Sequence, residues 1–215
     1  MDAAFFRDWL TAAAAVVETQ RDHLTQLDAA IGDADHGINM ARGFGAVTAA
    51  LAQRDPLTPG AVLTLAGSTL ISKVGGASGP LYGMALRSAG KALGDVPDAD
   101  LAALAAALEA ALGGVQKLGA AKEGEKTMVD ALAPAVSALA KALAEGAPAD
   151  GALTALAAAA AEGAQATISM QALKGRASYL GPRSVGHEDP GAASTALILR
   201  ALRDVAARGP EEHGQ

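Results

Sequence analysis

Three aspartates close together in the N-terminal part of the chain could bind a metal ion. Asp28, Asp33 and Asp35 fall within eight residues, and no lysine or arginine lies nearer to them in the sequence than Arg42 on one side and Arg21 on the other. An extended backbone over 33–35 would direct both of the later carboxylates to the same side. Carboxylates at this density suit Mg²⁺, which usually completes its shell with water and substrate phosphates. The alternative is a solvated turn that caps the next helix. The spacing of an EF-hand is absent.

A glycine-rich stretch could bind phosphate. The sequence Gly75-Gly-Ala-Ser-Gly79 precedes a predicted helix, and free backbone N–H groups at a helix N-terminus attract anions. The chain contains no Walker A motif, so a metal ion would have to neutralise much of the phosphate charge. A plain connection between two helices is the alternative interpretation.

Four further polar residues are candidates for ligand contacts. His36 could bind a phosphate oxygen, ligate a metal or cap a helix, and Asn39 lies about one helical turn further on. Arg176 lies in a loop flanked by Gly175 and Gly181 and could bind phosphate with two N–H groups. Asp189 precedes Pro190, which is also the pattern of a helix cap with proline at the first helical position.

Two lysines and two apolar residues have less specific interpretations. Lys122 and Lys126 are interpreted as solvated charges. Met128 and Leu173 could form an apolar slot for a nucleotide base, although a place in the core is the default for such residues.

These residues must be positioned by helices, because no stretch has the alternation of a strand. Apolar residues at helical spacing predict eight helices. We expect an all-α fold in which residues 1–208 form a single domain and residues 209–215 a flexible tail. The predicted helices cover approximately residues 3–29, 37–53, 60–74, 80–94, 99–118, 127–145, 151–171 and 191–207.

The order of the connections predicts that the candidate residues meet. If neighbouring helices are antiparallel, as short connections favour, every second connection lies at the same end of the bundle. The aspartate cluster, the glycine-rich stretch, residues 119–126 and residues 172–190 then share one end. The plain turns around Pro56, Pro97 and Pro148 share the other end. This segregation indicates a single site.

Composition excludes several classes of protein. The formal net charge of −6 and the lack of a basic stripe argue against a nucleic-acid partner. The chain contains no cysteine, and therefore no disulfide. Its first residues lack the pattern of a signal peptide, and charges or glycines interrupt every long apolar run. We expect a cytoplasmic protein that does not bind membranes.

Five segments resemble the nucleotide-binding DhaL subunits of dihydroxyacetone kinases, and the match runs over nearly the whole chain. One departure is Ala34, where the family usually has glycine; this alanine disfavours a positive φ but leaves the carboxylates intact. The matching segments are Ile31-Gly-Asp-Ala-Asp-His-Gly-Ile-Asn39, Gly75-Gly-Ala-Ser-Gly-Pro-Leu-Tyr-Gly83, Lys126-Thr-Met-Val-Asp130, Gly175-Arg-Ala-Ser-Tyr-Leu-Gly181 and His187-Glu-Asp-Pro-Gly-Ala192.

The resemblance implies an eight-helix antiparallel up-and-down barrel with a nucleotide site at one end. It implies that Asp28, Asp33 and Asp35 hold two Mg²⁺ ions and act in catalysis together with Arg176. The residues expected to contact ADP or ATP are His36, Gly37, Ile38, Asn39, Ala77, Ser78, Gly119, Met128, Arg176, Glu188, Asp189 and Pro190.

The resemblance also implies a reaction and partners. In such a subunit the bound ADP is recharged to ATP by a phosphocarrier of the phosphoenolpyruvate phosphotransferase system. The phosphoryl group then passes to dihydroxyacetone on a separate kinase subunit, which gives dihydroxyacetone phosphate. Whether the subunit forms a homodimer stays open.

Two other functions remain open at this point. One is a kinase subunit that exchanges free ATP and acts on another small ketose or a different acceptor. The other is a sensor of nucleotide state that docks on a transcriptional regulator. The intact aspartates and Arg176 favour chemistry over a purely regulatory role.

Overall fold

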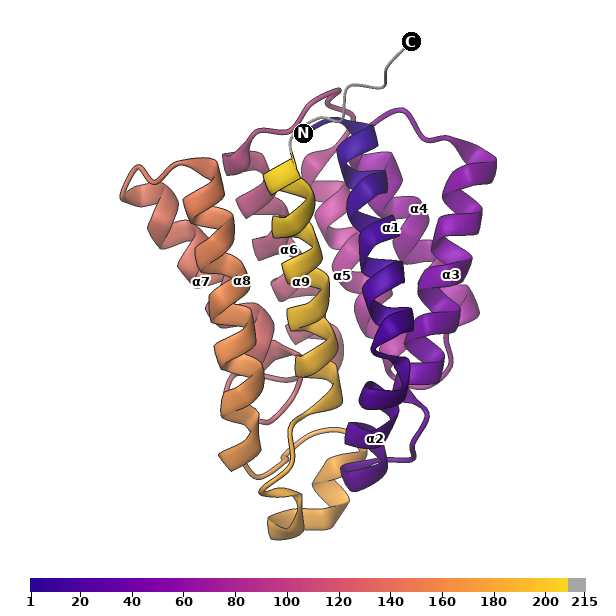
Figure 1. Cartoon of the computed structure of the whole chain (residues 1–215), viewed down its shortest axis with the longest axis vertical. Coiled ribbons are helices and arrows are strands. Elements are labelled where there is room, and N and C mark those ends of the chain that lie inside the picture. The colour runs from indigo at the N-terminus through magenta and orange to yellow at the C-terminus, as the bar shows by residue number, and fades with distance from the viewer. Residues whose placement is uncertain (209–215) are drawn as a thin grey trace.

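The computed structural model describes residues 1–208, and the predicted tail of 209–215 lies outside the described residues. The predicted all-α fold is confirmed, since no strand occurs within residues 1–208 (Figure 1). The helices are α1 (Ala3–Thr19), α2 (Arg21–Ile31), α3 (His36–Arg54), α4 (Pro59–Lys73), α5 (Ser78–Leu93), α6 (Leu101–Gly119), α7 (Val129–Ala144), α8 (Ala149–Ala166) and α9 (Pro190–Arg208), with the 3₁₀ helices η1 (Thr167–Ser169) and η2 (Arg176–Ser184).

Local sequence signals fix where several helices begin. The side chain of Asp2 accepts a hydrogen bond from Phe5 N, and that of Asp100 accepts one from Ala103 N. Thr58 caps α4, and Pro59 occupies the first position of that helix. Each cap satisfies a backbone N–H group that has no acceptor within its helix.

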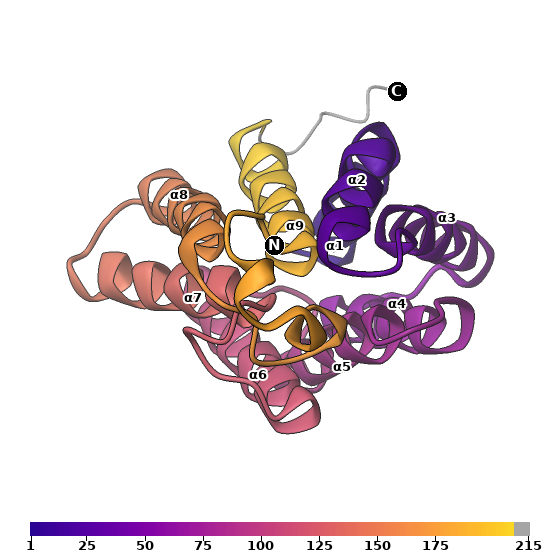
Figure 2. The same cartoon turned by 90° about the horizontal axis from the view of Figure 1, so that it is seen from below.

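The helices form a closed ring in which chain neighbours pack together. Figure 2, a view along the bundle, shows this order, and α1 closes the ring by packing on both α3 and α9. The interior is filled mainly by leucine and alanine, with Phe6 and Phe44 as large buried rings. Small residues allow close packing: a Cβ atom on Gly67 would lie 2.5 Å from the carbonyl oxygen of Gly83, so α4 and α5 need glycine there.

The predicted segregation of the connections is confirmed. The connections that carry the aspartates, the glycine-rich stretch, residues 120–128 and residues 167–189 all contribute to one cavity at the lower end of the bundle in Figure 1. We call this end the mouth. Its position follows from the antiparallel order of the helices.

Two predicted helices differ from those observed. The helix predicted over 3–29 breaks at Gln20, where φ is −96° and ψ is 8°, and α2 continues at a different angle toward the mouth. No glycine or proline marks this break, so periodicity could not reveal it. The helix predicted over 151–171 leaves the α conformation after Ala166 and continues as η1.

Within the described residues, α6 is long and apolar enough to cross a membrane by length and composition alone. Its buried leucines, Leu104, Leu108 and Leu112, belong to the core of the bundle, and the helix packs between α5 and α7. About 33% of this helix is buried inside the fold.

Candidate functional site

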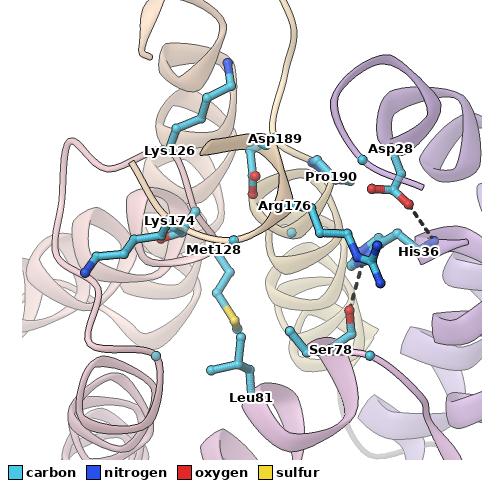
Figure 3. A pocket seen from close by; sticks show the side chains of 18 of the residues that line it. Asp28, His36, Ser78, Leu81, Lys126, Met128, Lys174, Arg176, Asp189 and Pro190 are labelled. Atoms are coloured by element: carbon cyan, nitrogen blue, oxygen red, sulfur yellow. Dashed lines mark hydrogen bonds between the residues drawn. The ribbon is translucent and has the colours of Figure 1, made fainter. Parts of the chain in front are cut away.

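A cavity of about 330 Å³ lies at the mouth. Figure 3 shows it from close by, with Asp28, His36 and Ser78 on one side and Met128 nearer the other. Most of the residues predicted for the site line this cavity, although they come from four separate connections. They are Asp28, Asp33, Asp35, His36, Ala77, Ser78, Gly119, Met128, Arg176, Asp189 and Pro190.

The three aspartates converge. Each of Asp28, Asp33 and Asp35 offers a carboxylate oxygen, and these three atoms lie within 4.8 Å of one another. Asp28 is buried, and its Oδ2 accepts hydrogen bonds from the backbone N–H groups of Asp35 (2.9 Å) and His36 (3.1 Å). The carboxylate of Asp28 therefore folds the loop back on itself and holds the other two aspartates beside it.

The backbone conformation of this loop differs from the predicted one. Ala34, between the two exposed aspartates, has a φ of 61°, so the backbone is left-handed there rather than extended. This conformation disfavours a side chain with a Cβ atom, and alanine carries that cost here. The expectation of an extended backbone over 33–35 was wrong, although the carboxylates do converge.

The cluster fits a hard divalent cation. Its donors are carboxylate oxygens, which Mg²⁺ prefers. The side chains of Asp33 and Asp35 are exposed, which leaves room for water or phosphate oxygens in the coordination shell. Asp28, Asp33 and Asp35 are the residues that would hold the metal.

His36 is fixed by hydrogen bonds on both sides of its ring. Its Nδ1 lies 3.1 Å from Ser78 Oγ, and its Nε2 lies 2.8 Å from Ser194 Oγ. Burial lowers the pKa of His36, although the carboxylates of Asp28 and Asp35 oppose this shift. A neutral imidazole with both nitrogens occupied is placed to orient the Ser78 hydroxyl at the cavity.

The hydrogen bonds continue behind His36 into the core. The hydroxyl of Tyr82 lies 2.7 Å from Ser194 Oγ and 2.8 Å from Thr195 Oγ1, and it donates to the carbonyl oxygen of Gly191. Burial raises the pKa of Tyr82, so this hydroxyl stays protonated. The network joins α3, α5 and α9 beneath the cavity. Ser194 and Tyr82 were not predicted, because nothing in the sequence pairs them with His36.

The glycine-rich connection delivers Ala77 and Ser78 to the cavity wall. Gly76 has a φ of 67°, which glycine adopts without strain, and α5 begins two residues later. The first N–H groups of a helix have no acceptor within it. The start of α5 therefore offers the cavity a positive end of a helix dipole.

Arg176 reaches across the mouth from η2. Its Nη2 lies 3.1 Å from Oδ2 of Asp33, and both side chains are well exposed. A guanidinium is thereby held next to the acidic cluster. The cation predicted to contact phosphate and the carboxylates predicted to bind metal are direct neighbours.

One side of the cavity is apolar. Met128 is buried and lines it, as predicted for a base slot, together with Leu81 and Val115. Leu173, the other residue proposed for the slot, is 54% exposed and does not line the cavity. Leu81 and Val115 were not predicted, because each lies at an ordinary core position of a helix.

Lys126 is buried, so its interpretation as a solvated charge was wrong. Its side chain is 1% exposed, whereas Lys122 in the same connection is exposed as predicted. The Lys126 ammonium donates only to backbone carbonyl oxygens. Spacing alone could not distinguish the two lysines.

Asp189 caps α9 and also lines the cavity, so both predicted interpretations have support in the geometry. Its Oδ2 accepts a hydrogen bond of 2.7 Å from Ala192 N. Burial raises the pKa of Asp189 to about 7, and the nearby Asp130 carboxylate adds to this shift, while the Ala192 N–H and Lys126 oppose it.

Four residues predicted to contact nucleotide do not line the cavity, and their contacts stay predictions. Gly37 packs against α2, where a Cβ atom would lie 2.0 Å from the carbonyl oxygen of Arg21. Ile38 is 52% exposed. Asn39 Oδ1 accepts a hydrogen bond from Arg42, and Glu188 accepts one from Gln165.

The fold and the site together agree with one family. Residues 30–204 match the model of the DAK2 domain, and the chain therefore belongs to the DAK2 domain family.

Two relatives within this family are DhaL subunits of dihydroxyacetone kinases. The chain is 43% identical to the Listeria innocua protein named "PEP-dependent dihydroxyacetone kinase 1, ADP-binding subunit DhaL", over 90% of this chain and 92% of that protein. It is 42% identical to the Escherichia coli "PEP-dependent dihydroxyacetone kinase, ADP-binding subunit DhaL", over 91% of this chain and 93% of that protein.

A solved structure shares the fold. The dihydroxyacetone kinase from C. freundii, in complex with AMP-PNP and Mg²⁺, superposes on 95% of this chain with a TM-score of 0.70 and 28% sequence identity. This chain covers 34% of that longer protein. The DhaL resemblance found from sequence motifs is thus confirmed by relatives that match about 90% of the chain.

Proposed function

We propose that the protein is the ADP-binding subunit of a phosphoenolpyruvate-dependent dihydroxyacetone kinase. The observation that carries this proposal is the convergence of four connections on one cavity. Three carboxylates within 4.8 Å lie beside Arg176 in that cavity. The DhaL relatives support the same conclusion.

Each group at the mouth has a part in holding the nucleotide. Asp28, Asp33 and Asp35 would hold two Mg²⁺ ions. The start of α5, with Ser78 oriented by His36, would bind phosphate oxygens. The apolar side around Met128 would accept the base.

The bound ADP would take a phosphoryl group from a phosphotransferase-system phosphocarrier and pass it to dihydroxyacetone on a partner subunit. Phosphoryl transfer depends mainly on positioning and on neutralisation of charge. Arg176 would supply positive charge beside the aspartates that does not depend on a metal.

The first experiment is native mass spectrometry of the purified protein. We expect a mass increase that corresponds to one ADP and two Mg²⁺. The purified protein is then mixed with a dihydroxyacetone-binding subunit and a phosphocarrier, and dihydroxyacetone phosphate formation from phosphoenolpyruvate is measured.

The outcomes separate the remaining alternatives. Turnover with free ATP and no phosphocarrier would instead support a kinase subunit that exchanges ATP. Bound nucleotide without any turnover, together with binding to a transcriptional regulator, would support a sensor. A protein that binds neither ADP nor Mg²⁺ would refute the proposed function.

A further inference from the structure

Lys126 is a buried cation that the proposed phosphoryl transfer does not use. Burying an ammonium group costs free energy unless all its N–H groups have acceptors. Lys126 meets this condition. Its Nζ donates to the carbonyl oxygens of Thr167 at 2.7 Å and Met170 at 3.2 Å, and also to that of His187. In Figure 3 Lys126 lies on the opposite side of Asp189 from Asp28 and His36.

The three carbonyl groups lie at the two ends of one segment. Thr167 and Met170 stand where the segment leaves α8, and His187 stands just before α9. Gly186 N also donates to Ile168 O at 2.7 Å, which joins the same two ends. The residues between these ends, 171–186, carry η2 and Arg176. The segment is therefore a loop closed at its base, with Lys126 at the point of closure.

The residues around Lys126 are themselves held in place. Asp130 is buried, and its carboxylate accepts hydrogen bonds from Gly124 N (2.5 Å) and Thr127 N (2.7 Å). Lys126 has a φ of 61°, a conformation that costs free energy for a residue with a side chain. Glu125 O accepts a hydrogen bond from Leu173 N at 3.1 Å. The connection between α6 and α7 thus forms a fixed base for the segment.

We propose that Lys126 is a positioning residue for Arg176. Its ammonium fastens both ends of segment 171–186 to the connection between α6 and α7, and so holds Arg176 beside the acidic cluster. This inference rests on the proposed function in one respect, namely that Arg176 acts on the transferring phosphoryl group. Lys126 lines the same cavity, but its ammonium donates to backbone carbonyl oxygens and not to the three aspartates, so it acts on Arg176 through the backbone.

The first test measures how fast trypsin cleaves the segment in nucleotide-free protein. Trypsin can cut after Lys174, Arg176 and Arg183, which all lie in the segment. In Lys126→Met, the carbonyl groups of Thr167, Met170 and His187 lose their donor, and we expect cleavage at these sites to become about tenfold faster or more. Cleavage after Lys141 in α7 reports on global unfolding and should stay slow. Lys122→Met, which removes an exposed lysine of the same connection, is the matched control and should behave as wild type.

The second test measures turnover with the partner subunits present. Lys126→Met should lower kcat about tenfold or more and leave the KM for dihydroxyacetone nearly unchanged. Introduced into Arg176→Ala, the same substitution should have little further effect, because residues that act as one unit have non-additive effects. Fully additive losses of kcat would overturn the proposal, as would a segment that is cut rapidly while turnover stays at the wild-type level.

Lys126→Arg keeps the charge and provides a second variant if Lys126→Met does not fold. Its planar group cannot direct three N–H donors at the same three carbonyl groups, so cleavage and kcat should both lie between those of wild type and a full loss. Rapid cleavage with unchanged kcat in this variant would again overturn the positioning role. If wild type lacks kinase activity, the proposed function fails, and the cleavage rates alone decide whether Lys126 anchors the segment.

Discussion

The Nη2 atom of Arg176 lies 3.1 Å from the Oδ2 atom of Asp33, although 143 positions separate the two residues in the chain. This ion pair links η2 to the loop before α3 across the mouth. Both side chains are exposed, so the pair contributes at most about 1 kcal/mol to folding. Its placement at the aspartate cluster indicates a role in function rather than in stability.

Arg176→Ala should therefore separate turnover from folding and nucleotide binding. We expect the melting temperature and ADP retention to change little, because the aspartates and the start of α5 remain. The kcat for dihydroxyacetone phosphate formation should fall by a factor of 100 or more, since a cation that faces developing charge contributes about 3 kcal/mol. Arg176→Lys should retain only part of the wild-type kcat. Wild-type turnover in Arg176→Ala would show that the arginine has no part in catalysis.

Removal of one exposed carboxylate should release the nucleotide. In Asp33→Ala or Asp35→Ala the metal loses a ligand, and the phosphates are then less well neutralised. We expect native mass spectrometry to find little bound ADP in either variant. Asp98→Ala, which alters an exposed aspartate outside the cavity lining, is the control and should retain ADP as wild type does. Full occupancy in both cluster variants would refute the metal site.

Chelation of Mg²⁺ should lower thermal stability. A ligand that binds only the native state stabilises it by about 4 kcal/mol at a thousandfold excess over its Kd. We expect EDTA to lower the melting temperature of the ADP-loaded protein well beyond the effect of an equal ionic strength of NaCl. An unchanged melting curve in a sample shown to have lost its nucleotide would contradict a tightly held cofactor.

Ala34→Gly should stabilise the protein. Ala34 has a φ of 61°, and relief of a left-handed alanine is worth about 1 kcal/mol. Denaturant unfolding of the metal-free protein measures this gain. The matched control is Ala158→Gly, in an exposed interior position of α8, which should destabilise by about 1 kcal/mol. Equal destabilisation by both substitutions would show that the alanine in the loop is not strained.

Asp189 should make stability depend on pH. Its pKa in the native state is raised to about 7 by burial, so the native state holds this proton more tightly than the unfolded chain does. The resulting stabilisation is complete below about pH 4 and is lost as the pH rises through about 7. Asp189→Asn keeps a side-chain oxygen for the cap and should flatten this slope in nucleotide-free protein. Asp100→Asn, at the cap of α6, should leave the slope in place, and an unaltered slope in Asp189→Asn would contradict the assignment.

Local patterns in the sequence were sufficient for the all-α fold. Apolar spacing and the breaks at glycine and proline act within a few residues, so they located the helices. The alternation of the connections then predicted which of them meet at the mouth. The same patterns could not predict the break at Gln20, because its residue types are all compatible with a continuous helix. The flexible tail and the cytoplasmic location stay predictions.

The tertiary structure decided which side chains serve which purpose. Lys122 and Lys126 look alike in sequence, yet only Lys126 is buried, because its three acceptors come from residues 41 to 61 positions away. The pairing of His36 with Ser78 and Ser194 joins three helices in the same way. Local propensity reflects interactions between neighbours in the chain, whereas the environment of a side chain depends on residues that only folding brings together.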